Sequence, residues 1–153
     1  MNPWLAPAAV AARLLDPLQP LLLLGLRLWV GWQFLKSGWL KLADWDTTLL
    51  LFQQEYRVPL LSPAAAAVAG TAGELLFPVL LTLGLWGRLA AIGLSAVNAL
   101  AVFAYAHVLL QDGFEAALGQ HCLWGLMLLV VAVFGPGRWS IDGWWPAGAG
   151  RRY

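Results

Sequence analysis

The stretch at residues 89–110 reads LAAIGLSAVNALAVFAYAHVLL and contains no Asp, Glu, Lys or Arg. As an α-helix with a rise of about 1.5 Å per residue, it is long enough to cross a hydrocarbon core of roughly 30 Å. Three other mainly apolar stretches have similar lengths, at about residues 21–42, 62–86 and 116–134. None of the four shows an alternating strand pattern, so the sequence predicts an all-α polytopic membrane protein, a four-transmembrane-helix bundle.

The composition of the whole chain agrees with this fold class. Of 153 residues, 61% are hydrophobic and only 11% are charged, too little polar cover for a water-soluble enzyme of this size. The net charge of +1 provides no basic patch for a nucleic-acid backbone, and a single cysteine, Cys122, excludes an intrachain disulfide. We therefore expect one integral membrane domain over residues 1–153, with the lipid bilayer as its main partner.

The connections suggest how the helices are arranged. Ser62 is a good N-cap and Pro63 suits the first position of the second helix. Residues 46–56, between the first two helices, mix apolar and polar side chains, which favours a short outer interfacial helix, with a plain loop as the alternative. No basic residue precedes the first apolar run, so we treat the amino-terminal segment as retained rather than as a signal peptide.

The loop charges predict an orientation. Five arginines fall on one side of a four-helix arrangement: Arg13, Arg88, Arg138, Arg151 and Arg152. The opposite loops hold two basic residues and most of the acidic ones. The positive-inside rule then places both termini in the cytoplasm.

Three polar residues are predicted to lie inside the bilayer, where each costs several kcal/mol unless it is paired. Glu74 and Asn98 fall near the middle of their helices, and Arg27 about four residues from the middle of its own. This depth estimate predicts an Arg27–Glu74 ion pair with Asn98 beside it. The pair either fixes helix register or forms the polar floor of a ligand pocket, in which Glu74 is the best candidate for a catalytic group.

One face of the first helix strengthens the pocket hypothesis. Residues recur on it at spacings of four and three: Arg27, Gly31, Phe34, Gly38 and Lys41. The glycines allow another helix or a ligand to come close, and close helix packing is the simpler interpretation. Our candidate ligand-binding residues are Arg27, Gly31, Trp32, Phe34, Glu74 and Asn98.

A second group of polar residues is expected at the outer ends of the helices. It comprises Lys41, His107, His121 and Cys122. The two histidines and the thiol could hold a metal or relay protons, but their spacing matches no recognised ligand motif. Contact with water or lipid headgroups is the alternative for each histidine, and no metal site is assigned.

Four short motifs occur in a characteristic order. They are Leu26-Arg27-Leu28 with Gly31 and Phe34, Gly38-Trp39-Leu40-Lys41-Leu42, Glu74-Leu75-Leu76 leading to GLWGRLAA at residues 84–91, and GPGRWSID at residues 135–142. Together they resemble the DoxX family of small four-helix bacterial membrane proteins. The resemblance covers about residues 20 to 143 and implies a quinone-linked or redox accessory role in the bacterial inner membrane. The HCLWG segment at residues 121–125 shows a fainter likeness to members associated with metal-binding peptide pathways.

Two classes of function stay open. In the first, the chain is a redox accessory subunit in which a quinone ring stacks on Trp32 or Phe34 and meets the polar groups. If it is enzymatic, it is an oxidoreductase subunit that acts with a partner, because none of its side chains carries electrons alone. In the second, it is a noncatalytic carrier or assembly partner, in a metal-binding peptide or metal-stress pathway. The small residues permit a homo-oligomer without requiring one.

Overall fold

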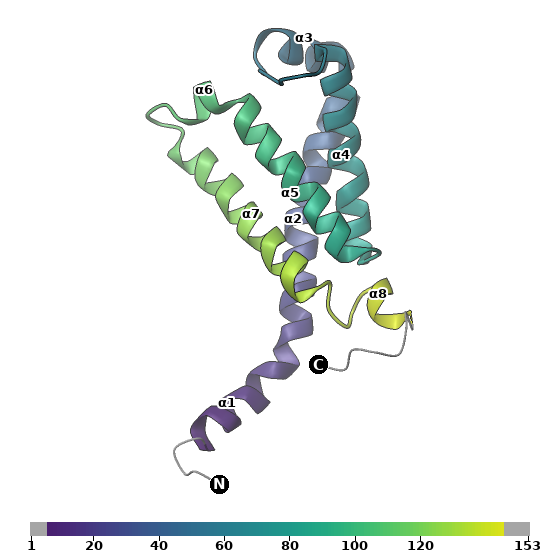
Figure 1. Cartoon of the computed structure of the whole chain (residues 1–153), viewed down its shortest axis with the longest axis vertical. Helices are drawn as coiled ribbons and strands as arrows, with labels where there is room; N and C mark the ends of the chain where they lie inside the picture. The colour runs from purple at the N-terminus through teal and green to yellow at the C-terminus, as the bar shows by residue number, and fades with distance from the viewer. Residues whose placement is uncertain (1–5, 146–153) are drawn as a thin grey trace.

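The computed structural model describes residues 6–145, and all secondary structure in this range is helical (Figure 1). The helices are α1 (Ala6–Leu15), the short 3-10 helix η2 (Asp16–Leu18), α2 (Gln19–Ala43), α3 (Trp45–Gln54), α4 (Pro63–Leu83), α5 (Gly87–Ala104), α6 (Ala106–Leu109), α7 (Glu115–Phe134) and α8 (Ile141–Trp144). Four helices are long and apolar enough to cross a membrane: α4, α5, α7 and a continuous helix from Val10 to Ala43 that includes α2. The predicted four-helix bundle is confirmed.

The helix boundaries differ from the sequence prediction at three places. The first spanning helix begins at Val10 rather than about residue 21. The second long helix ends at Leu83 rather than residue 86, because Gly84 adopts a left-handed conformation with φ 66°. The third is interrupted at Tyr105, which separates α5 from the four-residue α6. The ends of the expected domain, residues 1–5 and 146–153, lie outside the described range.

The predicted helix between the first two long helices is present as α3, which lies across one end of the bundle (Figure 1). Asp44 caps it by accepting a hydrogen bond of 3.1 Å from the Thr47 amide, and hydrogen bonding with Thr47 lowers the pKa of the Asp44 carboxyl. Ser62 caps α4 in the same way through the Ala65 amide at 3.3 Å, as the sequence predicts. We refer to this end as the α3–α6 end.

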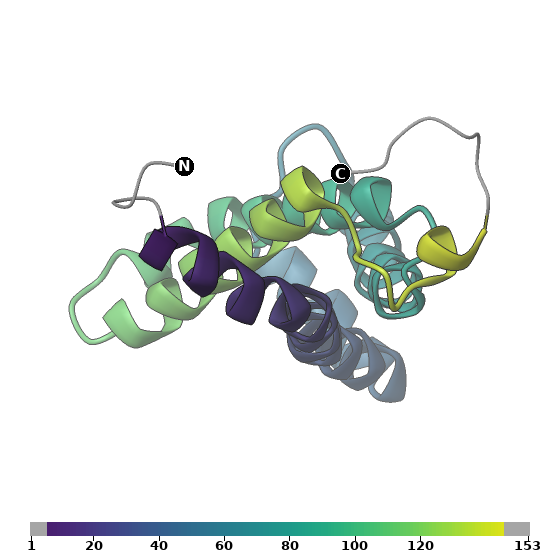
Figure 2. The same ribbon diagram turned by 90° about the horizontal axis from the view of Figure 1, so that it is seen from below.

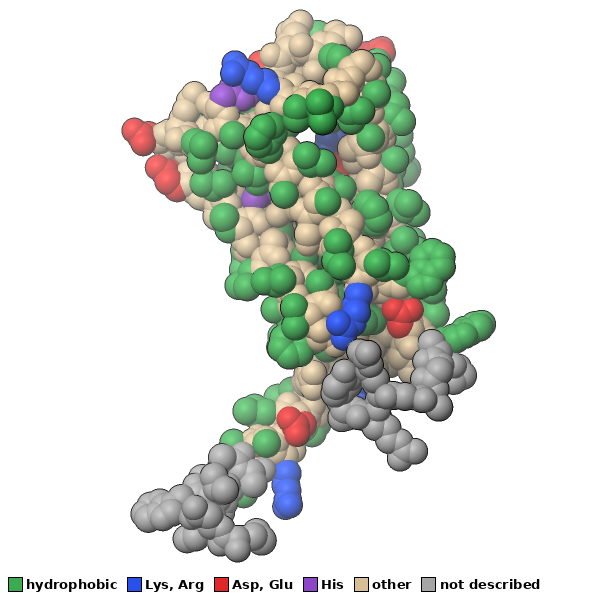
Figure 3. Space-filling model, viewed as in Figure 1, with side chains coloured by type: hydrophobic (Ala, Val, Ile, Leu, Met, Phe, Trp, Pro, Cys, Tyr) green, Lys and Arg blue, Asp and Glu red, His purple; other side chains and the backbone are tan. Residues whose placement is uncertain are grey.

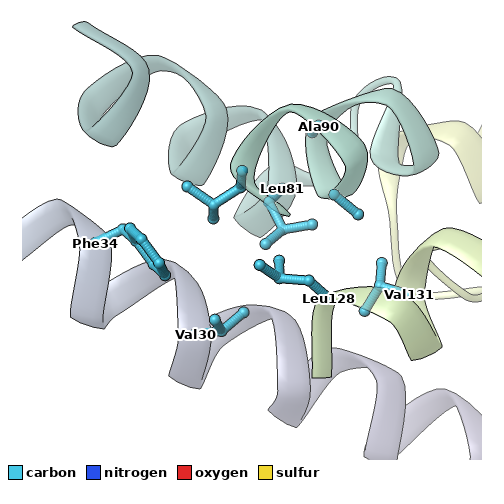
Figure 4. Packing of buried hydrophobic residues seen from close by; sticks show 8 residues of the cluster. Val30, Phe34, Leu81, Ala90, Leu128 and Val131 are labelled. Carbon is cyan, nitrogen blue, oxygen red and sulfur yellow. The ribbon is translucent and has the colours of Figure 1, made fainter. Parts of the chain in front are cut away.

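The main core lies where the four long helices meet. It consists of Val30, Phe34, Leu81, Ala90, Ala91, Leu94, Leu128 and Val131 (Figure 4). In a bilayer, apolar side chains gain little from leaving lipid, so van der Waals packing between small and branched side chains holds such a core together. A smaller cluster of Phe52, Ala66 and Ala67 attaches α3 to α4.

Glycines set the register between the antiparallel helices α2 and α4. A Cβ atom at Gly31 would lie 2.6 Å from Thr82 Cγ2, and one at Gly38 would lie 2.9 Å from the Leu75 side chain. Gly31 and Gly38 therefore face Thr82 and Leu75. This register places Glu74 level with Gly38 and Arg27 beyond the end of α4.

The segment after α7 returns to the bundle at the opposite end, where α8 lies beside the turn between α4 and α5 (Figure 2). The Asp142 carboxylate accepts hydrogen bonds from the amides of Trp86 at 2.9 Å and Gly87 at 2.7 Å. Asp142 thereby caps the first turn of α5. The N-cap residue of α5, Trp86, makes no side-chain capping hydrogen bond of its own. We call residues 135–145 the closing segment.

Candidate functional site

A cavity of about 290 Å³ lies between α2, α4, α5 and α7, next to the α3–α6 end. Figure 3 shows a hollow on this face with basic and acidic side chains inside it and hydrophobic ones around it. The volume is close to the lower end of the roughly 300–1,000 Å³ typical of small-molecule sites. The lining residues are Ser37, Lys41, Phe52, Tyr56, Val58, Leu61, Ala66, Ala69, Gly70, Glu74, Val97, Leu100, Ala101, Ala104, Tyr105, Leu109 and His121.

An ion pair between α2 and α4 forms the polar part of the cavity wall. Lys41 Nζ lies 2.7 Å and 2.5 Å from the two carboxylate oxygens of Glu74, and it also donates to Ser37 Oγ at 2.9 Å. The Lys41 and Glu74 side chains are 19% and 9% exposed. Because the two charges neutralise each other, the cavity carries no net charge from this pair.

A second polar contact joins α5 to α7. Asn98 Nδ2 donates to the His121 carbonyl at 3.0 Å, and Asn98 Oδ1 lies 2.8 Å from His121 Nδ1. An amide oxygen can only accept, so Nδ1 carries the proton in this contact and Nε2 of a neutral imidazole is left as an acceptor. Trp124 holds the other side of the ring, with centroids 4.9 Å apart. His121 is thus fixed in one orientation beside the cavity.

Aromatic side chains cover the end of the cavity beneath α3. Phe52 and Tyr56 make an edge-to-face contact with centroids 4.9 Å apart, and Tyr56 makes another with Tyr105 at 5.4 Å. Burial is the main cause of a raised pKa at Tyr56, with smaller contributions from Tyr105, Glu74 and Glu55. The Tyr56 phenol therefore stays protonated and can donate a hydrogen bond.

The predicted Arg27–Glu74 ion pair is wrong. Glu74 pairs with Lys41, and the fully buried Arg27 donates through Nη2 to the Trp139 carbonyl in the closing segment. The physical reason is the α2–α4 register, which brings Lys41 rather than Arg27 to the level of Glu74. In the described part of the chain, Arg27 Nε and Nη1 have no hydrogen-bond partner.

The other residues expected around Arg27 do not line the cavity. Gly31 packs against Thr82, which leaves no room there for a ring, and Trp32 is 59% exposed on the outer surface of α2. Phe34 is buried in the core with its ring edge-to-face with Trp124, at a centroid distance of 5.5 Å. Of the predicted ligand-binding residues, only Glu74 lines the cavity directly, and Asn98 reaches it through His121.

The predicted outer cluster is partly brought together. Lys41 and His121 both line the cavity, whereas His107 stacks edge-to-face on Tyr105 at 5.6 Å and Cys122 is exposed. Within residues 6–145, no three His, Cys, Asp or Glu side chains are grouped so that they could share a metal ion.

Sequence reasoning missed the contribution of Tyr56 and Tyr105 to this site. A signal for both was available, because the chain has only three tyrosines and these two lie near the predicted outer ends of helical segments. Amphipathic aromatic residues favour such positions, where one side of the ring meets apolar groups and the hydroxyl meets polar ones.

The bundle and its cavity define a small polytopic membrane protein with a partly polar site between its helices. The family model of DoxX matches residues 22–107, which is more than half of the chain. The chain therefore belongs to the DoxX family. No curated protein and no solved structure matches it.

Proposed function

We propose that this chain is a redox accessory protein of the bacterial inner membrane that binds a quinone ring in the cavity. The observation that carries the proposal is the Lys41–Glu74 ion pair in the wall of an otherwise mainly apolar cavity. Ionisable groups are costly inside a bilayer and commonly mark a ligand or proton site. A flat ring with two carbonyl oxygens suits apolar walls combined with a few hydrogen-bond donors.

The side chains have distinct roles in this proposal. The Tyr56 phenol donates a hydrogen bond to one carbonyl oxygen of the ring. Lys41, which Glu74 holds in place, exchanges its hydrogen bond to Ser37 for one to the other carbonyl oxygen. His121, which Asn98 orients, is the second position at which a proton can be held. Reduction of a quinone to a quinol takes up two protons and two electrons. These residues serve the protons, and a partner oxidoreductase supplies the electrons.

A ligand titration with a matched pair of variants tests the proposal. Ala101 lines the cavity, whereas Ala99, two residues earlier on α5, is exposed. We expect a short-chain benzoquinone to quench tryptophan fluorescence saturably in the native protein and in Ala99→Leu. Ala101→Leu should weaken binding at least about tenfold, because the added atoms occupy ring space.

Quinone dissolved in the lipid also quenches tryptophan fluorescence in all three proteins. This background is measured with protein-free nanodiscs that contain a tryptophan standard, and it is subtracted. Linear, unsaturable quenching in the native protein, or equal affinity in the two leucine variants, contradicts the proposal. Quinone retained by the purified native protein, measured after solvent extraction, provides an independent readout.

A second candidate function, an assembly partner without a ligand, is favoured by the exposure of α7. Only Leu128 and Val131 are buried on this helix, so most of its surface is free to contact another membrane protein. Co-purification of a partner that depends on exposed α7 residues such as Leu126 and Leu129, in a protein that binds no quinone, would support this function instead.

A further inference from the structure

Aromatic side chains cover the end of the cavity beneath α3, and Leu61, in the chain between α3 and α4, is a lining residue that is also exposed. Phe52, Tyr56 and Tyr105 line this end in consecutive edge-to-face contacts. The backbone adds a fixed connection, because the Arg57 amide donates to the Ala104 carbonyl at 2.9 Å and so holds the chain after α3 against the end of α5. A ligand arriving from water at this end would have to displace several packed rings.

The side of the cavity between α4 and α5 is different. Ala69 on α4 and Leu100 on α5 both line the cavity and are both exposed on the outside of the bundle. Each belongs to a helix long and apolar enough to cross a membrane, so this part of the cavity wall faces hydrocarbon rather than water. Figure 3 shows hydrophobic side chains around the hollow on this face.

We propose that the cavity takes its ligand sideways from the bilayer, through an opening between Ala69 and Leu100. The ligand is an uncharged, lipid-soluble ring whose apolar tail stays in the lipid outside Leu100. It is uncharged because Glu74 already neutralises Lys41, so an anionic or cationic headgroup would add an unpaired charge inside the membrane. This inference rests on the proposed function for the identity of the ring, but the route of entry can be tested without a quinone.

A buried thiol reports the route. Ala104 lines the cavity and is 6% exposed, so Ala104→Cys in a Cys122→Ser background places one reactive group inside. In lipid nanodiscs it is treated with N-phenylmaleimide, a neutral flat ring, or with a sulfonated maleimide. In both, the thiol adds across the maleimide double bond. We expect the charged reagent to label at least about tenfold more slowly, because charged groups are excluded from hydrocarbon.

Two further variants locate the opening. Ala69→Phe should slow labelling by N-phenylmaleimide several-fold, whereas Val68→Phe, at the neighbouring exposed position that does not line the cavity, should leave the rate unchanged. Tyr56→Ala should let the sulfonated reagent in faster, because it removes one of the rings that cover the end beneath α3. Both reagents should label the denatured protein equally.

Equal labelling by both reagents in the folded protein, no effect of Ala69→Phe, or no labelling by either reagent overturns lateral entry. These outcomes are distinct from a failure of the proposed function. Labelling from the lipid side without saturable quinone binding would refute the proposed ligand and support the route of entry. Saturable quinone binding with equal labelling by both reagents would support the ligand and refute the route.

Discussion

Lys41 and Glu74 are the residues on which the site depends most, and each is stable in the membrane only because of the other. Their side chains keep 19% and 9% exposure, and Ser37 accepts a further hydrogen bond from Lys41. Removing one partner of a buried pair leaves an uncompensated charge, whereas replacing both with apolar side chains can be nearly neutral. The pair therefore has a signature that a double-mutant cycle can detect.

We predict that Lys41→Met and Glu74→Leu each lower the free energy of unfolding by about 2–4 kcal/mol, and that the double variant loses less than either single one. Glu74→Gln should lose less than Glu74→Leu, because its amide oxygen still accepts from Lys41. The free energies of unfolding of these four variants are measured in mixed micelles with an increasing fraction of a denaturing detergent. Lys36→Met, on the exposed face of α2, is the control for removing a cation. Additive single effects would show that the pair contributes nothing.

The sequence predicted that Glu74 needs a cation but indicated the wrong one. The estimate aligned helix midpoints, which would set Gly31 against the middle of α4, whereas Gly31 packs on Thr82 near its end. That difference of about nine residues is roughly 13 Å along a helix. Helix sliding is fixed by glycine-to-side-chain contacts that hydropathy does not report. Spans, N-caps and the polar stripe depend on local sequence, and so they could be predicted.

At the scale of elements, the closing segment acts as a cap for a helix that is distant in sequence. Trp86 starts α5 in a left-handed conformation with φ 49° and provides no side-chain cap, so Asp142 supplies the acceptors instead. Gly84 completes the fit, because a Cβ there would lie 2.3 Å from Ser140 Cβ. The GPGRWSID sequence contributed to the family resemblance. Its structural role, capping the turn between α4 and α5, is seen only in the three-dimensional structure.

We predict that Asp142→Ala destabilises the bundle by about 1–3 kcal/mol, because two backbone amides lose their acceptor. Asp142→Asn should lose less, since one side-chain oxygen remains. Asp112→Ala, at an exposed turn before α7, serves as the matched control and should change stability little. Thermal unfolding in detergent compares the three variants, and faster amide hydrogen exchange should concentrate at residues 86–89 in Asp142→Ala. Exchange that rises evenly over the protein would contradict this role of Asp142.

At the scale of the whole molecule, basic residues gather at the end that holds the closing segment. Arg88 and Arg138 lie there, and Arg13 precedes α2 at the same end (Figure 1). The α3–α6 end carries Asp44, Asp46, Glu55, Asp112 and Glu115. This distribution supports the proposed orientation, with the cavity in the half of the bundle that faces away from the cytoplasm.

We predict that single cysteines at Asp112 and Arg138 react from opposite sides of the membrane. Both positions are exposed, and the native Cys122 is first replaced by serine. In intact cells with a permeabilised outer membrane, an impermeant thiol reagent should label the Asp112→Cys protein and leave the Arg138→Cys protein unlabelled until the inner membrane is opened. Labelling of both from outside would refute the orientation, and labelling of Arg138→Cys alone would invert it.

The hydrogen bond from Arg27 to the Trp139 carbonyl joins residues 112 positions apart. It can therefore form only late in synthesis of the chain. A ribosome adding about 5–20 residues per second needs roughly 6–22 s to reach Trp139 after it has made Arg27. Throughout that interval the Arg27 guanidinium lacks the Trp139 acceptor, and its burial in hydrocarbon is energetically costly. We therefore expect the Arg27 side chain to stay in contact with water or the insertion machinery until Trp139 has been synthesised. Chains that stop short of Trp139 lack this acceptor, so we expect their first spanning helix to be less stable in the membrane.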